Sequence, residues 1–80
     1  MKTVKSLLEA KRDAKKGNHS VVITSNYRRF YYYETPICFV NDRNKTFMTN
    51  NWGWNTKSTN RSINSYRKQL KEKGYREVGG

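Results

Sequence analysis

The sequence predicts a small α+β domain in which an antiparallel sheet of three to four strands packs against two helices, in the order α-β-β-β-α with an optional last β-strand. Two observations predict this class. Apolar residues recur at helical spacing near both ends, whereas residues 20–49 are rich in branched and aromatic residues. Eighty residues support only one core, so we expect a single domain over residues 1–80.

The first helix is expected over residues 3–16. Its apolar residues fall near one face, namely Val4, Leu7, Leu8 and Ala14. Thr3 can cap its start, and Gly17 with Asn18 supplies a stop. The opposite face of this helix is basic.

The strands are expected at residues 21–24, 29–33, 37–40 and 46–49. Ser25 and Asn26 are suited to a turn, and the polar residues 41–45 should join the last two strands into a hairpin. Pro36 cannot donate a ladder hydrogen bond, so we expect it at a strand start or on an edge.

The second helix is predicted by Ile63, Tyr66 and Leu70, which form a narrow apolar stripe. Thr56, Ser58 or Thr59 can each cap its start. The helix should end at Lys73, because Gly74 suits the left-handed position and Tyr75 can fold back on Leu70 in a Schellman motif. Residues 75–78 can add a short strand, and residues 79–80 should fray.

The charge balance restricts the class of partner. Seventeen Lys and Arg stand against six Asp and Glu, a net charge of +11, and such an excess favours a polyanion: DNA, RNA or an acidic protein face. The hydrophobic fraction of 34% is low enough for disorder, but an aromatic fraction of 14% favours a folded domain.

The single cysteine and the lack of a recognisable targeting signal in the sequence lead us to expect a cytoplasmic protein. Cys38 is the only cysteine, so neither an internal disulfide nor a multi-cysteine zinc site is expected. It lies in the apolar run 37–40, as a buried small hydrophobe and not a nucleophile. The sequence shows no signal-peptide core and no apolar run long enough to span a membrane.

Motifs for catalysis are missing. His19, the sole histidine, follows the expected helix stop and is interpreted as a turn residue, and Glu34 has no second acid placed beside it by any motif. P-loop, zinc-protease, EF-hand and dinucleotide-binding patterns do not occur. We therefore expect no enzyme, no catalytic residues, no cofactor, no metal and no small-molecule substrate.

A basic stripe runs along the second helix, opposite its apolar stripe. Its members recur at spacings of three and four: Lys57, Arg61, Asn64, Lys68 and Lys71. Such a face can be simply solvated. Only Glu72 offsets the positive charge of this helix, however, and solubilising faces usually mix both signs, so phosphate contact is the sharper hypothesis.

Two tryptophans separated by a glycine, Trp52 and Trp54, lie in the Asn-rich segment 50–56 that leads into the second helix. Nucleic-acid bases would suit them, because an aromatic side chain contributes on the order of 1–3 kcal/mol per stacked base. The alternative is that one Trp closes the small core and the other covers its rim.

Residues 27–33 form an aromatic and basic strand with two distinct sides. In extended backbone Tyr27, Arg29, Tyr31 and Tyr33 share one side, and Arg28, Phe30 and Tyr32 share the other. Sheets that bind single-stranded RNA present such surfaces, but core packing is expected for one of the two sides. Arg28 and Arg29 are candidates for widening the positive surface.

The strand residues Tyr33-Glu34-Thr35-Pro36-Ile37, followed by a hairpin and by the helix entry Asn55-Thr56-Lys57-Ser58-Thr59-Asn60-Arg61, resemble a group of small uncharacterised proteins encoded by bacteriophages and mobile elements. The resemblance covers about residues 27–70 and rests on short motifs. It implies a phage or mobile-element origin and carries no functional residues over.

These patterns predict a small, basic, phage-type nucleic-acid-binding module for DNA or RNA, driven by phosphate contacts with aromatic stacking. The alternative is a phage-encoded inhibitor of a host defence or nucleic-acid-processing complex, for example anti-CRISPR-like, that grips an acidic protein face or a ribonucleoprotein. A third interpretation is a structural, ribosome-associated basic protein. Oligomeric state follows from none of these patterns.

Overall fold

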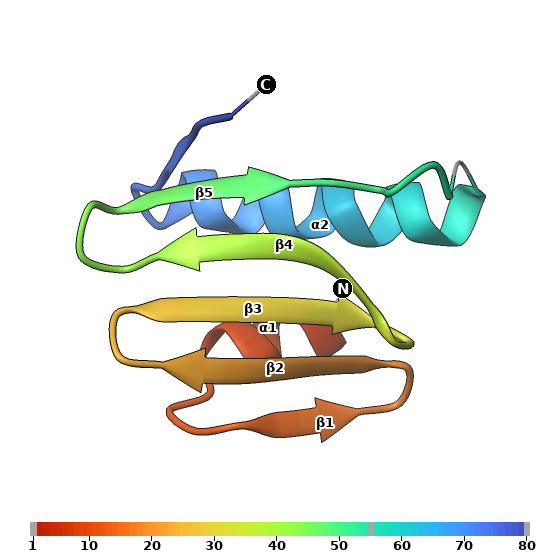
Figure 1. The fold of residues 1–80 in the computed structure, drawn as a ribbon, viewed down its shortest axis with the longest axis horizontal. Coiled ribbons are helices and arrows are strands. Elements are labelled where there is room, and N and C mark those ends of the chain that lie inside the picture. The colour runs from red at the N-terminus through yellow and green to blue at the C-terminus, as the bar shows by residue number, and fades with distance from the viewer. Residues whose placement is uncertain (1, 55, 80) are drawn as a thin grey trace.

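A computed structural model describes residues 2–54 and 56–79 and shows two helices on one six-stranded sheet (Figure 1). The elements are, in chain order, α1 (Lys2–Leu8), β1 (Ala14–Lys16), β2 (His19–Thr24), β3 (Tyr27–Tyr32), β4 (Thr35–Asn41), β5 (Thr46–Thr49), α2 (Lys57–Glu72) and β6 (Arg76–Glu77). The α+β class is confirmed. Of the expected fraying end, Gly80 lies outside the described residues.

The strands lie in the sheet in the same order as in the chain. Each of the first five is antiparallel to its neighbour, whereas β6 returns after α2 and pairs in parallel with β5, Thr46 facing Arg76. The sheet is therefore mixed and has six strands, more than the three to four antiparallel strands expected. The optional strand expected over residues 75–78 is confirmed as β6, whereas β1 was not expected, because its three residues fall within the predicted first helix and are too few to show a period.

The first helix is shorter than predicted, because it ends at Leu8 and the end of the predicted helix, 14–16, forms β1. Ala14 pairs with Val21, and the Asp13 carboxylate accepts a hydrogen bond of 2.7 Å from the backbone N–H of Ile23. Gly17, with φ +59°, sits in the β1–β2 turn and does not stop a helix. Ladder pairing with β2 has overridden helix propensity here.

Both helices cover the same face of the sheet, so the core forms between that face and the helices (Figure 1). The buried apolar residues are Val4, Leu7, Leu8, Val21, Phe30, Ile37, Cys38, Val40, Phe47, Ile63, Tyr66 and Leu70. The apolar face predicted for α2 is confirmed. The other face of the sheet has no helix over it.

A β-bulge in β4 brings two consecutive residues into the core. Phe30 pairs with Cys38 and Tyr31 pairs with Pro36, so Ile37 is the extra residue. Ile37 and Cys38 are both buried, although strand neighbours usually point to opposite faces. Pro36 stands near the start of β4 beside this bulge, in agreement with its expected place.

The ends of α2 follow the sequence signals. Thr56 caps the start, because its hydroxyl accepts a hydrogen bond of 3.2 Å from the backbone N–H of Thr59. At the other end the N–H of Tyr75 donates to the Leu70 carbonyl at 2.9 Å, and the N–H of Gly74 donates to Lys71 at 3.1 Å. This is the predicted Schellman motif, and it turns Tyr75 back onto the core.

Candidate functional site

The predicted basic stripe of α2 lies on the surface, with all five members exposed: Lys57, Arg61, Asn64, Lys68 and Lys71. Its C-terminal end is partly neutralised, because Glu77 lies 3.5 Å from the Lys71 ammonium and 2.9 Å from the guanidinium of the neighbouring Arg67. Lys57, Arg61 and Lys68 form no ion pair with any residue that the structure describes. Two of these three uncompensated cations, Lys57 and Arg61, therefore lie near the α2 N-terminus, and Lys68 follows two turns after Arg61.

The first turn of α2 holds cations where helices usually hold acids. It contains no acidic residue, and Lys57 and Arg61 are four residues apart on one face. The positive end of the helix dipole disfavours Lys57, the first helical residue, by about 0.3–1 kcal/mol, and its repulsion with Arg61 one turn later adds about a few tenths. An anion bound here would relieve both effects.

A pocket of about 470 Å³ opens beside this turn, between α1, the β1–β2 turn, β3 and α2. We call it the cationic pocket. Its lining residues are Thr3, Lys16, Gly17, Asn18, His19, Tyr32, Lys57, Ser58, Arg61 and Ser62. Three cations and no carboxylate line it, which suits an oxyanion.

His19 is part of this lining, and its position corrects the sequence interpretation. It is not a turn residue: it begins β2 and is only 6% exposed. Its Nδ1 atom is buried and has no hydrogen-bond partner among the described residues. Burial lowers the pKa of His19, so the imidazole is neutral near pH 7.

A second pocket, of about 350 Å³, lies beside the start of α2 and the β3–β4 turn. We call it the aromatic pocket. It is lined by Tyr32, Tyr33, Thr35, Ile37, Trp54, Thr56, Ser58 and Thr59. Tyr33 and Trp54 are 63% and 59% exposed, so two large rings stand at its rim largely in solvent.

Neither tryptophan closes the core, which excludes that alternative. Trp52 is 55% exposed, and its indole Nε1–H donates to the carbonyl of Pro36. Its backbone N–H donates to the Asn50 side chain at 2.8 Å, and the N–H of Gly53 donates to Asn51 at 3.0 Å. The loop is thus held by its own asparagines; Asn55 lies outside the described residues.

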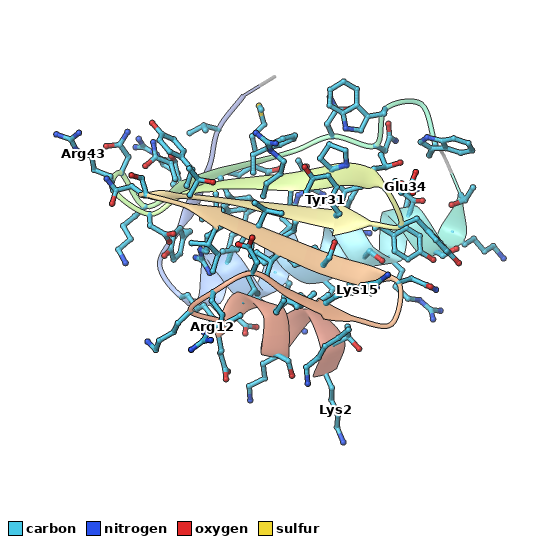
Figure 2. All side chains as sticks on the ribbon, turned by 60° about the horizontal axis from the view of Figure 1, so that its bottom comes forward. Lys2, Arg12, Lys15, Tyr31, Glu34 and Arg43 are labelled. Carbon is cyan, nitrogen blue, oxygen red and sulfur yellow. The ribbon has the colours of Figure 1, made fainter. Side chains whose placement is uncertain are left out.

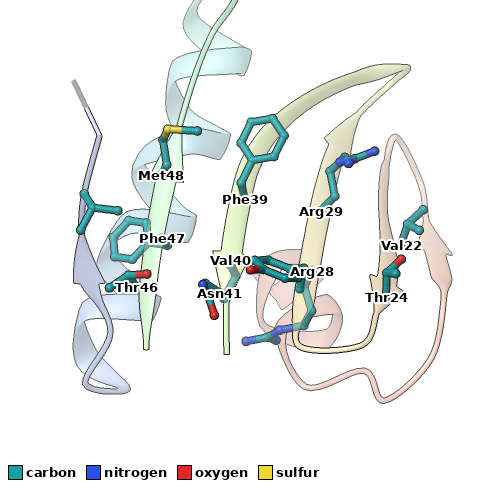
Figure 3. A pocket seen from close by; sticks show the side chains of 12 residues that line it. Val22, Thr24, Arg28, Arg29, Phe39, Val40, Asn41, Thr46, Phe47 and Met48 are labelled. Atoms are coloured by element: carbon teal, nitrogen blue, oxygen red, sulfur yellow. The ribbon is translucent and has the colours of Figure 1, made fainter. Parts of the chain in front are cut away.

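The uncovered face of the sheet carries the predicted side of β3, with Tyr27 and Arg29 exposed and Tyr31 half-buried. Register aligns Arg29 with Val22 of β2 and with Phe39 of β4, and Phe39 with Met48 of β5. These four side chains form a row around a hollow of about 330 Å³ (Figure 3). The alternation along β3 predicted that Arg29 lies on this face. The residues that flank it in the row follow only from the pairing register.

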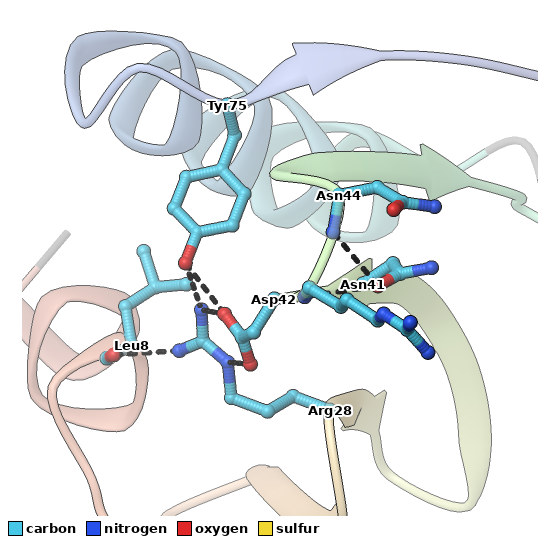
Figure 4. A network of polar contacts seen from close by, with 7 residues as sticks. Leu8, Arg28, Asn41, Asp42, Asn44 and Tyr75 are labelled. Atoms are coloured by element: carbon cyan, nitrogen blue, oxygen red, sulfur yellow. Dashed lines mark hydrogen bonds and ion pairs between the residues drawn. The ribbon is translucent and has the colours of Figure 1, made fainter.

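Arg28, predicted as a surface contact, instead ties parts of the fold together (Figure 4). Its guanidinium binds the Asp42 carboxylate through two hydrogen bonds of 2.8 and 2.7 Å and donates to the Leu8 carbonyl at 2.8 Å. The Tyr75 hydroxyl completes the cluster. Four of the five N–H donors of Arg28 are engaged in these contacts, and its side chain is only 10% exposed, so it is not a surface contact.

The remaining cations are dispersed over the molecule. Lys2, Arg12, Lys15 and Arg43 project from different edges (Figure 2). Most of the positive charge is therefore a general field. Three cations, Lys16, Lys57 and Arg61, meet at the cationic pocket beside the α2 start, and no carboxylate lines it.

The Cys38 thiol is inaccessible and is not readily ionised. Cys38 is fully buried, and burial raises the pKa of its thiol to about 12. The described residues contain no cluster of three or more His, Cys, Asp or Glu side chains. Neither helix within the described ranges is long and apolar enough to cross a membrane.

Comparison with known proteins adds no relative: no family model, no curated protein and no solved structure matches this chain.

Proposed function

We propose that this protein binds DNA or RNA through the N-terminal half of α2 and the pockets beside it. The observation that carries the proposal is the group of uncompensated cations, Lys16, Lys57 and Arg61, around a pocket at a helix start with the exposed Trp54 nearby. Phosphates are the anions that such an arrangement suits best. Nucleic acids carry phosphates next to flat bases, which can stack on an exposed aromatic side chain.

The cationic and the aromatic side chains have different roles in this proposal, which follow from their chemistry. Lys57, Arg61 and Lys68 contact backbone phosphates, which requires no particular sequence. Exposed aromatic side chains stack on bases, which is also sequence-tolerant. The protein therefore binds with general affinity and strong salt dependence, and without base-specific readout.

The test is a salt titration of binding to labelled single- and double-stranded DNA and RNA of one length, measured by fluorescence anisotropy from about 50 to 300 mM salt. Arg61→Glu combined with Lys68→Glu should weaken binding and lower the slope of log affinity against log salt by about 0.7–0.9 for each lost phosphate contact. Absence of binding to every probe near 50 mM salt contradicts the proposal.

The control for this variant is Arg43→Glu, a single charge reversal in the β4–β5 turn, at the opposite end of the sheet from the α2 start (Figure 1). It changes the general field without touching either pocket. A loss of affinity per charge equal to that of the α2 variant would mean that only the net charge matters.

A second candidate function, a phage-encoded inhibitor that binds a host protein or ribonucleoprotein, is favoured by the uncovered sheet face. Val22 and Met48 are each 39% exposed and Tyr27 is 59% exposed, and apolar surface of this kind contributes more to a protein interface than to phosphate contact. The test is co-purification of a host complex with this protein after nuclease treatment. The double variant Val22→Glu with Met48→Glu should abolish this co-purification. Retained capture by that variant would contradict it.

A further inference from the structure

The cationic and aromatic pockets adjoin each other. Tyr32 and Ser58 line both, so the two hollows share a wall at the end of β3 and the first turn of α2. The rings of His19, Tyr32 and Tyr33 follow one another across this boundary, with centroids 4.9 Å and 4.7 Å apart. An anion site and an aromatic site thus lie side by side.

The cationic half has the composition of an oxyanion site. Its cations come from separate elements, Lys16 from β1 and Lys57 and Arg61 from α2, and no acid balances them in the lining. An independent observation is His19, which is 94% buried with an orphaned Nδ1 in the same lining. A buried polar atom without a partner costs about 1–3 kcal/mol, so the fold keeps an unmatched polar group beside these three cations.

The aromatic half is shaped for a flat ring. Tyr33 is held by two contacts to Asn18: its N–H donates to the Asn18 carbonyl at 2.6 Å, and its hydroxyl accepts from the Asn18 amide at 3.1 Å. Its φ of +57° is uncommon for a non-glycine residue. In the same lining Trp54 exposes an indole, and Ile37 adds an apolar side chain.

From this adjacency we propose that the two pockets together hold one unpaired nucleotide, with a phosphate among Lys16, Lys57 and Arg61 and the base between Tyr33 and Trp54. This inference rests on the proposed nucleic-acid function and adds to it a preference for single strands. A base inside a duplex is stacked on both faces and cannot enter the aromatic pocket. It would first have to be flipped out of the duplex, which costs unstacking and unpairing energy.

The size of the two hollows agrees with this ligand. Volumes of about 350 and 470 Å³ lie in the range of small-molecule sites, and each hollow is lined by the chemistry that one half of a nucleotide requires. A phosphate alone would leave the aromatic pocket empty, and a nucleoside alone would leave the cations unpaired. A nucleotide engages both.

The experiment compares a single-stranded octanucleotide with a duplex of the same length by anisotropy, and titrates uridine monophosphate, uridine and inorganic phosphate into labelled protein by NMR. We expect the single strand to bind more tightly. The monophosphate should shift the amide signals of residues 32–33 and 57–61 at lower concentration than either fragment.

Two variants separate the halves of the site. Trp54→Ala should weaken single-strand binding about 5- to 150-fold, the equivalent of one lost stacked base, and leave the salt slope unchanged. Arg61→Ala should weaken it on the order of tenfold and reduce the salt slope by about one contact. Trp54 and Arg61 are both exposed, so neither change removes core contacts.

The matched controls are Tyr27→Ala, an exposed aromatic residue on the uncovered sheet face, and Arg43→Ala. Both should leave the preference for single strands intact. Salt-dependent binding that is equal for single strand and duplex, or insensitive to Trp54→Ala, overturns this inference and leaves the proposed function standing.

Failure of the proposed function has a different signature. If no polymer binds near 50 mM salt but uridine monophosphate still shifts residues 32–33 and 57–61, the nucleotide pocket is supported and polymer binding is refuted. If neither the polymers nor the monophosphate bind, both proposals are refuted.

Discussion

Tyr66 is fully buried at the centre of the core, where its ring packs on Phe30 with centroids 4.8 Å apart. Its hydroxyl is buried without a hydrogen-bond partner among the described residues, and burial raises the pKa of this group. The ring therefore stabilises the fold while the oxygen does not.

Tyr66→Phe should accordingly leave the free energy of unfolding unchanged or raise it by up to about 1 kcal/mol, because it removes an unsatisfied buried polar atom and keeps the ring. Tyr66→Ala should cost about 3–5 kcal/mol through the cavity it leaves. Urea denaturation followed by circular dichroism measures both. A loss above about 1 kcal/mol in Tyr66→Phe would show that a water molecule satisfies the hydroxyl.

His19 should make stability depend on pH. Burial lowers its folded pKa below the ordinary value of 6.5, so the unfolded chain binds a proton more readily than the folded one. The free energy of unfolding should therefore be constant above about pH 7 and fall as the pH drops through 6.5. His19→Gln should flatten this profile between pH 7.5 and 5, and an unaltered slope would assign the dependence to other groups.

Alternation along β3 predicted which of its residues share a side, but not what Arg28 does. Arg28 lies on the same side as Phe30, and that side is the covered one. A cation there needs an acid, and its acid, Asp42, lies 14 residues further along the chain, in the β4–β5 turn. Pattern within one strand contains no information about this pairing, which depends on register.

At the scale of elements, both helices were predictable, but only the end of α2 was, and not the end of α1, for a physical reason. The end of α2 is determined by local chemistry, since Gly74 and Tyr75 close a Schellman motif within the helix itself. The end of α1 is determined by β2, which draws Ala14 into a ladder opposite Val21. The cationic pocket escaped prediction in the same way, because Lys16, His19 and Arg61 meet only in the folded chain.

The Arg28 cluster joins four elements, since it links β3 to the end of α1, the β4–β5 turn and the segment after α2 (Figure 4). Arg28→Ala should lower the free energy of unfolding by about 2–4 kcal/mol, because it leaves Asp42 and the Leu8 carbonyl without their donor. Arg28→Lys should recover little, since lysine lacks the planar fork that reaches both acceptors.

Arg29→Ala is the matched control, one residue away on the exposed side of the same strand. It should change the free energy of unfolding by no more than about 0.5 kcal/mol. Similar losses in the two alanine variants, measured by urea denaturation, would refute the clamping role of Arg28.

At the scale of the whole molecule, the net charge of +11 opposes compaction. Only three ion pairs occur among the described residues, so self-repulsion outweighs specific attraction. Raising NaCl from about 10 to 200 mM should therefore increase the urea midpoint, because the Debye length shrinks from about 30 Å to under 10 Å. A midpoint that falls with salt would show that the ion pairs dominate.

The order of strands in the sheet also has a kinetic consequence. From β1 to β5 every sheet neighbour is the next strand in the chain, so each pairing closes a loop of a few residues and loses little chain entropy. The parallel pairing of β6 with β5 is different, because it must wait for all of α2. A chain emerging from the ribosome can thus form hairpins one after another, and we expect the packing of α2 against the sheet, which also builds both pockets, to be the last step of folding.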